Sequence, residues 1–589
     1  MNNLHSFYND KITLYESQLA VLKKQLFASS MIRLIVFCIA AFAIYFFFGS
    51  PKLVLGIVIL AIILFLALVS RHTNLQYKRD KLLALIKINS TEIQVLDRNY
   101  HHLATGTEFK DPEHYFSQDI DLFGKGSFFQ YCNRTALPQG SETLAALLKE
   151  NALTAIDQKQ QAIMELAKMP DWRQNFSAIA SLVKTETPYT VIIKWMKQYE
   201  SFVPAIMKFL PMLFSIASVI IITGYFMGWM PGLVLIGWFF LGLVISGRFL
   251  KKINKLSNDT AKIQTTFQQY KQLIEKLEDT DFQCDLLAQR RRTIVQENGK
   301  ASSVLHQFSR HLSALDQRNN ILIAFFANAF LLRDLQLSFA IEKWVGQHGN
   351  DIEAWFETIA FFDAYNSLGN FGYNHPDYTY PRLVESGVVL KSEAAGHPLL
   401  DPQKSILNDV EIDDEQFFII TGANMAGKST FLRTVSLQIV MANMGLPVCA
   451  SHTEYHPIKL ITSMRTTDSL TDDESYFFSE LKRLKYIVDE IQNDRYFIVL
   501  DEILKGTNST DKAKGSRKFV ERLVASKSTG IIATHDLSLC EVVEELPQVK
   551  NYYFDAEIID HELHFDYKFK KGICQNMNAS FLLKKMGIV

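Results

Sequence analysis

The chain has 589 residues, a formal net charge of −1 and 48% hydrophobic residues. Such a length exceeds what one hydrophobic core supports and predicts roughly three or four domains. The balanced charge excludes a global field that would attract nucleic acid or acidic lipid. The six cysteines are scattered without a C-x-x-C pair, which argues against a disulfide framework or a zinc site and is typical of a reducing compartment. Neither zinc nor haem is expected.

The N-terminal region combines a polar segment with a long apolar one. Residues 1–30 are predicted to form an amphipathic helix. Leu34–Pro51 and Leu53–Ser70 are each 18 residues without a charged side chain, and Lys52 separates them. A membrane-spanning helix needs about 20 apolar residues. Residues 31–70 are therefore predicted to form a transmembrane helical hairpin.

Residues 72–200 are predicted to be the first part of a helical core. Their composition is mixed, and Ser141–Glu150 and Ala155–Lys168 both carry apolar residues three and four positions apart. This spacing places the apolar side chains on one face of a helix.

A second apolar region follows the first helical part. Phe209–Gly247 contains 39 residues without a charge and is broken near its middle by Gly228–Gly232. Buried helices of a soluble protein usually keep a polar face, which this segment lacks. Its length suits two spans and a tight turn, so residues 205–250 are predicted to form a second transmembrane hairpin.

Lysine and arginine indicate how the two hairpins are oriented. The turns contain only Lys52, whereas the flanks are basic. The flanking basic residues are Lys23, Lys24, Arg33, Arg71, Lys78, Arg79, Lys81, Lys194, Lys197, Lys208, Arg248, Lys251, Lys252 and Lys255. Because basic residues stay on the cytoplasmic side, we expect a multi-pass protein of the cytoplasmic (inner) membrane, with both termini in the cytoplasm. A cleaved signal peptide is not expected.

Residues 251–382 are predicted to be a further helical part of the core. Lys251–Gln296 is charged and has few helix breakers, which predicts a long exposed helix or helix pair. Ile321–Leu332 is a third apolar run, but it has 12 residues and contains Asn328. It is too short for a membrane span and is predicted to be a buried helix of a soluble domain.

From about residue 383 the pattern changes to short β-branched runs that alternate with helices. This alternation predicts an α/β domain over residues 383–589, with a parallel sheet covered by helices on both faces. The expected strands are Gly387–Leu390, Phe417–Ile420, Tyr496–Leu500 and Gly530–Ala533.

Thr421–Thr430 reads Thr-Gly-Ala-Asn-Met-Ala-Gly-Lys-Ser-Thr and satisfies the P-loop motif G-x-x-x-x-G-K-[ST] between a strand and a helix. Inward-pointing N–H groups and the helix N-terminus favour phosphate there, so the domain is predicted to bind ATP with Mg²⁺. Lys428 would reach the β- and γ-phosphates, and Ser429 would hold Mg²⁺. The predicted nucleotide-binding residues of this motif are Gly422, Ala423, Asn424, Met425, Ala426, Gly427, Lys428, Ser429 and Thr430.

Two later strands end in residues suited to hydrolysis. Asp501 and Glu502 follow an apolar strand, where ligands of parallel sheets gather. Asp501 is predicted to support Mg²⁺, and Glu502 to polarise the attacking water as general base. His535 ends the next strand and is predicted to sense the γ-phosphate. The polar segment Gly506–Thr510 suits a subunit contact. Glu502, His535 and Lys428 form the predicted catalytic set of an ATP hydrolase.

Several segments resemble the ATPase of the MutS family of DNA mismatch-repair proteins. The matching segments are Thr421–Thr430, Met441–Val448, Asp468–Leu481 with Ser475, Phe477 and Glu480, Leu500–Thr510, Ala533–His535, and the closing segment with Tyr567, Lys568, Gly572 and Ser580 through Gly587. Those that resemble the family's helical core and lever helices are Gly126–Gly140, Asp363, Ser367, Tyr378 and Pro381. The resemblance covers roughly residues 110–200 and 300–589.

The resemblance implies an ABC/MutS-like ATPase domain preceded by an all-α core, with residues 251–382 as lever helices. It also implies a homodimer in which Ser475 approaches the γ-phosphate of the other subunit, with Tyr553 beside the adenine and DNA as a partner. The chain departs from the family pattern in three places. Ala423 replaces the usual proline, Asp473 a glycine and Ser141 an arginine. Asp473 adds a negative charge near the implied dimer contact.

Mismatch reading is not expected. Members of the family carry an N-terminal domain with a Phe-x-Glu triplet, whereas the triplets Phe478–Glu480 and Phe519–Glu521 of this chain fall within the ATPase. The basic cluster Arg290–Arg292 has acidic neighbours that would cancel much of its attraction for phosphate, so a solvated helix face is the favoured interpretation. DNA binding is implied by the resemblance alone.

The leading hypothesis is a membrane-anchored MutS-like ATPase that couples ATP hydrolysis in a dimeric site to movement of a helical core. The alternative is an ABC-type ATPase for transport or membrane remodelling. However, the chain lacks Leu-Ser-Gly-Gly-Gln, and its apolar segments lack the charge that translocation routes usually carry. A third class, an ATP-dependent tether without hydrolysis, would keep Lys428 but would not need Glu502.

Overall fold

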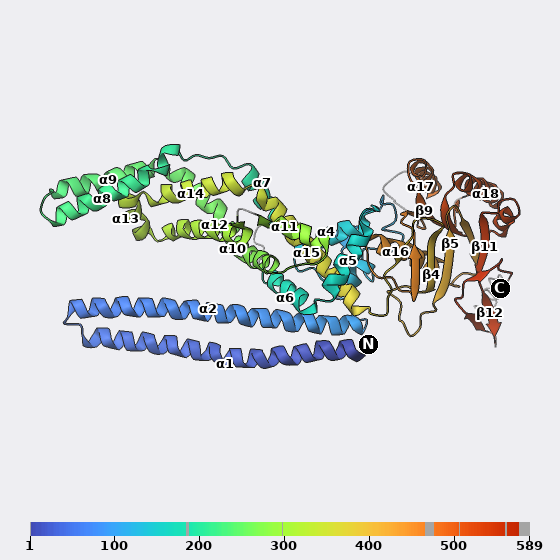
Figure 1. The fold of residues 1–589 in the computed structure, drawn as a ribbon, viewed down its shortest axis with the longest axis horizontal. Coiled ribbons are helices and arrows are strands. Elements are labelled where there is room, and N and C mark those ends of the chain that lie inside the picture. Colours follow the sequence, from blue (N-terminus) through green and yellow to red (C-terminus); the bar gives the residue numbers. More distant parts are fainter. Residues whose placement is uncertain are drawn as a thin grey trace.

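The computed structural model describes residues 2–183, 188–296, 299–465, 476–505, 507–559 and 562–575. Within these residues the molecule is elongated, as Figure 1 shows. Two helical arms extend from one side of a central helical body, and an α/β domain lies on the opposite side. The N-terminus lies beside the body, at the base of the first arm.

The first arm consists of two long antiparallel helices, α1 (Asn2–Phe46) and α2 (Pro51–Leu96). The predicted boundaries were wrong on both sides of the apolar segment. Residues 1–30 are not a separate helix, because α1 contains no glycine or proline that would end it. Likewise, α2 continues past residue 72 into what was predicted to be core. Pro51 is the first residue of α2, where the fixed φ angle of proline fits a helix and its missing N–H is not needed.

The second arm is formed by helices that are far apart in the sequence. They are η2 (Ala205–Lys208), α8 (Leu210–Phe226), α9 (Gly232–Gly247), α10 (Leu250–Glu278), α12 (Ala301–Asp316), η3 (Gln317–Asn319), α13 (Ile321–Leu331) and α14 (Arg333–His348). The prediction of an exposed helix over Lys251–Gln296 was wrong for α10. Phe267 and Leu277 are buried on its inner face, and α10 packs along α12. The apolar spacing of α10, rather than its charge, decides this packing.

The third apolar run, Ile321–Leu332, is also not the buried helix that was predicted. Its helix α13 packs one face against α8 and α9. Leu322 and Phe326 of the other face are 71% and 56% exposed. No core surrounds this apolar run, because α13 lies beside α8 and α9, part-way between the tip of the arm and the body (Figure 1).

The body surrounds α15 (Asp351–Asn374), a helix that is buried along most of its length. The other body elements are η1 (Thr107–Phe109), α3 (Phe128–Cys132), α4 (Pro138–Lys149), α5 (Ile156–Ala167), α6 (Pro170–Ser181), α7 (Tyr189–Lys197), α11 (Asp285–Arg292), β1 (Val295–Gln296) and β2 (Gly299–Lys300).

The buried Asp363 carboxylate accepts hydrogen bonds from the backbone N–H groups of Ala136 and Leu137 at the start of α4. A Cβ atom at Gly140 would collide with this carboxylate. Burial raises the pKa of Asp363 to about 7.

A buried polar network fastens the first arm to the end of α15. The Tyr8 hydroxyl of α1 donates to Asn374 Oδ1 at 2.6 Å, and Asn374 Nδ2 donates to Glu92 Oε2 of α2 at 2.7 Å. Arg134 Nε also donates to Glu92, at 2.6 Å. Removing one member would leave a buried polar group without its partner. The base of the first arm and the end of α15 therefore move together.

The C-terminal α/β domain contains two main sheets. In the described residues the larger one has the order β14-β11-β6-β10-β9-β8, with β14 antiparallel and its other strands parallel. Its strands are β6 (Phe417–Gly422), β8 (Lys459–Ser463), β9 (Tyr496–Asp501), β10 (Thr529–Ala533), β11 (Val549–Phe554) and β14 (Lys570–Lys571). The domain's helices are α16 (Lys428–Asn443), α17 (Tyr476–Glu490), α18 (Ser509–Ala525) and η4 (Leu537–Glu544). The predicted parallel sheet is thus present.

One predicted strand, Gly387–Leu390, lies outside this parallel sheet. It falls in β4 (Val388–Ala395), which pairs antiparallel with β5 (Asn408–Asp413) and β7 (His452–Tyr455). The remaining short strands are β3 (Arg382–Leu383), β12 (Ala556–Ile559) and β13 (Glu562–Phe565). A β-branched run indicates a strand but not its partners, because pairing depends on distant segments.

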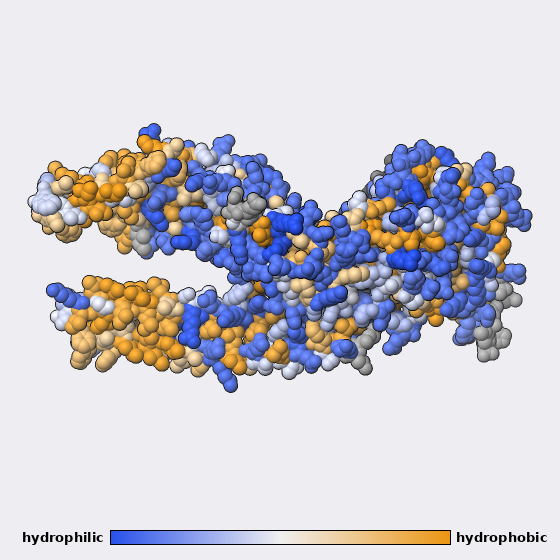
Figure 2. Space-filling view, in the orientation of Figure 1, coloured by the Kyte–Doolittle hydropathy of each residue, from blue (hydrophilic) through white to orange (hydrophobic). Residues whose placement is uncertain are grey.

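The surface changes character along the molecule. Figure 2 shows hydrophobic residues covering the far ends of both arms and hydrophilic residues predominating elsewhere. By length and composition, α1 and α2 could each cross a membrane. Two bent pairs satisfy the same criterion only when each is taken as one span: α9 with α10, bent by 60°, and residues 324–331 of α13 with α14, bent by 82°. The described residues therefore contain two to four candidate spans.

The contact between α9 and α13 gives a stability test with a matched control. A Cβ atom at Gly242 would collide with the backbone of Ala329, whereas one at Gly237 of the same helix would meet nothing within 4 Å. Gly242→Ala is expected to destabilise the fold by about 1–3 kcal/mol through overpacking. Gly237→Ala should be neutral or stabilising, because alanine favours a helix. Thermal unfolding of the purified variants checks this, and equal midpoints would contradict the contact.

Candidate active site

The P-loop connects β6 to α16 through a backbone that requires glycine. Gly422 and Gly427 have φ angles of +147° and +106°, and Met425 between them has a φ of +68°. A Cβ atom at Gly422 would press against the backbone of Phe554 on the neighbouring strand. The left-handed angles and the close approach explain why these positions hold glycine. The loop therefore has the shape with which phosphate cradles present their N–H groups.

Lys428, the first residue of α16, is buried and folds back over the loop. Its Nζ donates to Gly422 O at 2.7 Å and Ala423 O at 3.0 Å, and it lies 3.4 Å from His535 Nε2. Burial lowers the pKa of Lys428, while the nearby Asp501 and Glu502 act in the opposite direction. A phosphate bound at the loop would place a negative charge next to this buried ammonium and would accept charge-assisted hydrogen bonds from it.

Ser429 and Asp501 come together as predicted for a metal site. The Ser429 hydroxyl donates to Asp501 Oδ2 at 2.7 Å at the edge of the cleft. A hydroxyl and a carboxylate are hard oxygen ligands that fit Mg²⁺, which usually takes one or two protein ligands and completes its shell with water and phosphate. The donor set therefore fits the implied cation.

Glu502 and His535 are hydrogen-bonded to each other next to this position. Glu502 Oε1 lies 2.9 Å from His535 Nε2, and Glu502 N donates to Ala533 O at 2.9 Å. Glu502 has a φ of +53°, an uncommon angle for this residue type that turns the chain directly after β9. The hydrogen bond from His535 lowers the pKa of Glu502 to about 2. Glu502 is therefore an ionised carboxylate at neutral pH, ready to accept hydrogen bonds from water.

A buried glutamate supports the turn that follows Glu502. Glu480 of α17 is 3% exposed and accepts the N–H of Leu504 at 2.5 Å and of Lys505 at 3.1 Å. Leu504 also has a left-handed φ of +59°. Burial raises the pKa of Glu480, opposed by these two hydrogen bonds. Only the family resemblance drew attention to Glu480, because nothing in its local sequence indicates a buried acceptor.

One cleft of about 610 Å³ is lined by most of the predicted site residues, whereas Gly422, Ala426 and Glu480 lie outside its lining. The predicted residues that line it are Ala423, Asn424, Met425, Gly427, Lys428, Ser429, Thr430, Asp501, Glu502 and His535. Other segments of the α/β domain contribute side chains that motif reasoning missed, and these are His397, Leu400, Lys404, Ile406, Phe431, Phe554 and Tyr567. Burial lowers the pKa of His397 to about 4, so this imidazole is neutral at pH 7, and Leu400 and Ile406 add apolar surface beside it. No motif marks the segment between β4 and β5, and its role comes from its position beside the P-loop.

Tyr553 does not line this cleft, contrary to the prediction. Successive residues of β11 point to opposite faces of the sheet. Phe554 faces the cleft, while the Tyr553 ring lies under Lys570 Nζ, 5.9 Å from the ring centroid. Ser475, Asp473 and Gly506 lie outside the described residues.

Substitution of Glu480 tests the support of the catalytic turn. Glu480→Ala would leave the buried N–H of Leu504 without its acceptor, at a cost of about 1–3 kcal/mol, and would also remove the acceptor of the partly exposed Lys505 N–H. The variant is expected to unfold at a lower temperature and to lose ATP turnover through displacement of Glu502. Glu480→Gln retains an acceptor oxygen and should recover part of both losses. Thermal unfolding and phosphate release measure them, and an alanine variant with unchanged stability would contradict the assigned role.

Comparison with known proteins agrees with the site geometry. Residues 418–584 match the family model described as MutS domain V. The chain is 30% identical over 213 residues to human "MutS protein homolog 4", which covers 34% of this chain and 22% of that protein. It is 30% identical over 257 residues to "DNA mismatch repair protein MutS" of Methanosarcina mazei, and this match covers 42% of this chain and 28% of that protein. It is 29% identical over 244 residues to "DNA mismatch repair protein MutS 2" of Halobacterium salinarum, and this match covers 41% of this chain and 28% of that protein.

The chain thus spans less than a third of the length of these curated relatives. Their names and the domain V match confirm the predicted MutS likeness for the α/β domain. The α/β domain of this chain is thus similar to MutS domain V, and its P-loop, Lys428, Asp501 and Glu502 meet at one cleft.

Proposed function

We propose that this chain is a membrane-anchored MutS-like ATPase. It binds ATP with Mg²⁺ in the α/β domain and couples hydrolysis to movement of a helical body whose arms are held in a lipid bilayer. The observation that carries the proposal is the placement of two features at opposite ends of one molecule. The P-loop cleft is at one end, and the hydrophobic ends of both arms are at the other (Figures 1 and 2).

Hydrolysis follows from the arrangement of the cleft. Lys428 would exchange its contacts with the loop carbonyls for the β- and γ-phosphates. Ser429 and Asp501 would hold Mg²⁺, which supplies charge neutralisation at the phosphates when bound. Glu502 accepts a hydrogen bond from the attacking water and takes its proton. His535 holds the Glu502 carboxylate in place and lies near Lys428, where it would register the γ-phosphate.

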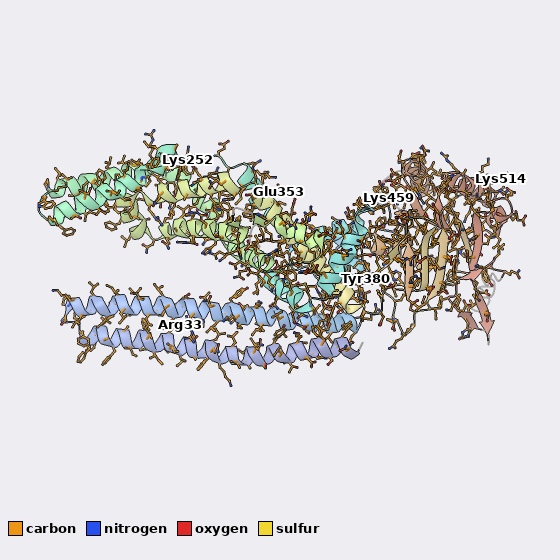
Figure 3. All side chains as sticks on the ribbon, viewed as in Figure 1. Arg33, Lys252, Glu353, Tyr380, Lys459 and Lys514 are labelled. Carbon is orange, nitrogen blue, oxygen red and sulfur yellow. The ribbon has the colours of Figure 1, made fainter. Side chains whose placement is uncertain are left out.

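Membrane anchoring is supported by the level at which the two hydrophobic ends begin. Arg33 precedes the apolar part of α1, and Lys252 follows α9. Figure 3 shows both residues at similar positions along the long axis. A single bilayer boundary at this level would place both hydrophobic ends in lipid, with the basic flanks on the cytoplasmic side. The ATPase domain then lies in the cytoplasm, where ATP is available.

Dimerisation and DNA binding are proposed from the family likeness. A second copy of the chain would complete the ATP site with Ser475. DNA is a weaker proposal, because Arg291 of the Arg290–Arg292 cluster already donates to Leu277 O and Glu278 O and pairs with Asp281. Charge that is neutralised within the protein contributes little to phosphate binding. Sequence-specific reading of mismatches is not proposed.

Substitution of Glu502 tests the hydrolytic assignment. Glu502→Gln is expected to lower ATP turnover by about 10²–10⁴-fold, because an amide cannot accept the proton of the attacking water. Nucleotide affinity should be retained, since Lys428 and the loop are unchanged. Glu544→Gln, an exposed position in the same domain, is the matched control. Phosphate release and binding of a fluorescent ATP analogue measure the two properties. Full turnover by Glu502→Gln would exclude Glu502 as the base, and a wild-type chain that binds but never hydrolyses ATP would support the tether alternative.

ATP turnover in lipid nanodiscs tests the partners. Duplex, mismatched and branched DNA are added separately across a range of salt concentrations, with Lys428→Ala as the background control. If DNA is a partner, turnover should rise with DNA, and the rise should weaken as salt increases. If the rate of ATP turnover is unchanged by every DNA but rises with a transported cargo, the ABC-type alternative is favoured.

A further inference from the structure

The second arm carries the short apolar helix α13, whose length excludes it as a membrane span. We propose that α13 is nevertheless a lipid-contacting element. In this arrangement it lies across the arm, with Leu322, Phe325 and Phe326 against the acyl chains of one leaflet. The inference rests on the proposed membrane anchoring and extends it to a segment outside both predicted hairpins.

The polarity of α13 is inverted relative to a helix on the surface of a soluble domain. Leu322, Phe325 and Phe326 are 71%, 45% and 56% exposed. Their spacing of three and four residues places them on one outward stripe. The polar residue of the helix, Asn328, is turned inward and is 8% exposed. A water-facing helix would show the opposite distribution, so the outer face of α13 is built for an apolar environment.

The inner face of α13 is held by the contacts that membrane helices use with one another. Gly242 of α9 allows the backbone of Ala329 to approach closely, and small residues serve this purpose at helix contacts in lipid. The Ser218 hydroxyl of α8 donates to Phe330 O at 2.6 Å and accepts the indole N–H of Trp238 at 2.7 Å. These polar groups are satisfied inside the arm, as they must be where no water reaches them.

Charged residues confine α13 to the boundary of the apolar region. Arg318 Nε lies 3.3 Å from Asp334 Oδ2 in a nearly buried ion pair that joins the segments before and after the helix. Asn328 Oδ1 also accepts the Asp334 N–H at 2.9 Å. The helix turns by 82° into α14, which runs along the arm. With 11 residues, α13 is about 16 Å long, too short to cross a hydrocarbon core of about 30 Å.

Lipid is a better occupant of this face than a protein partner. The outer stripe of α13 lies on the same arm end as the exposed Phe240 and Val244 of α9, the helix against which it packs. Figure 2 shows hydrophobic surface continuing over this end of the arm. A protein partner would have to cover α8, α9 and α13 together, whereas a bilayer that receives α8 and α9 covers α13 without further contacts.

Photolabelling of the full chain tests the inference without substitution. The protein is reconstituted in phosphatidylcholine vesicles doped with a phospholipid that carries a diazirine on its acyl chain, and adducts are mapped by mass spectrometry. In one preparation the diazirine lies near the ester, and in the other near the terminal methyl. Leu83 at the base of α2 and Leu537 of the α/β domain, 45% and 37% exposed, serve as internal controls for exposed apolar residues in water.

Adducts are expected on residues 321–331 as well as on α8 and α9. The adducts on α13 should be lost with the deep probe, which carries the diazirine near the terminal methyl. No adducts are expected on Leu83 or Leu537. Adducts on α1, α2, α8 and α9 without any on α13 would overturn this inference and leave the anchoring intact. Labelling of α13 by the deep probe alone would overturn its placement across the arm. Protein–protein cross-links in place of lipid adducts would show a second copy on this face. Absence of adducts from all four long apolar helices would instead refute the anchoring itself.

Discussion

The contacts that join distant segments of this molecule depend on one recurring interaction. In each, a largely buried carboxylate accepts two hydrogen bonds from another segment. Asp363 binds the start of α4, and Glu342 binds the N–H groups of Phe202 and Val203 before the second arm. Glu278 binds Ser302 at the start of α12 through its N–H and its hydroxyl. Loss of the carboxylate would leave buried N–H groups unpaired, which is costly. The elements therefore hold fixed positions at their joints.

The same device connects the body to the ATPase domain. Asp119 is buried and accepts hydrogen bonds from the backbone N–H groups of Met464 and Arg465 just after β8, as well as from the Thr462 hydroxyl. Within the domain, Glu480 holds the turn after Asp501 and Glu502 in the same way. A displacement of this turn is therefore resisted by specific bonds. Asp119 thus links the α/β domain to the body, and Asn374 of α15 links the body to the base of the first arm.

The distribution of exposed side chains differs between the two ends of the molecule. The α/β domain and body bury their apolar residues and expose charge, as soluble domains do. The far ends of the arms reverse this arrangement, since Phe226 and Val244 are 81% and 70% exposed, while Ser218 is buried. In lipid the backbone must satisfy its own hydrogen bonds, and helices achieve this. Under the proposed membrane anchoring, this requirement fits the arm ends, whose regular elements are all helices in the described residues.

The sequence alone determined the features that depend on neighbouring residues. The P-loop, the acid pair after β9 and the uncharged runs of the two hairpins were readable because each is continuous in the chain. Only the tertiary structure decided features that depend on distant residues. These include the antiparallel pairing of β4, the burial of one face of α10, the absence of Tyr553 from the cleft and the apolar surface near His397. The clearest case is α13, whose apolar run predicted a buried helix of a soluble domain. Packing against α8 and α9 turned Asn328 inward and the phenylalanines outward, and a local pattern carries no information about that choice.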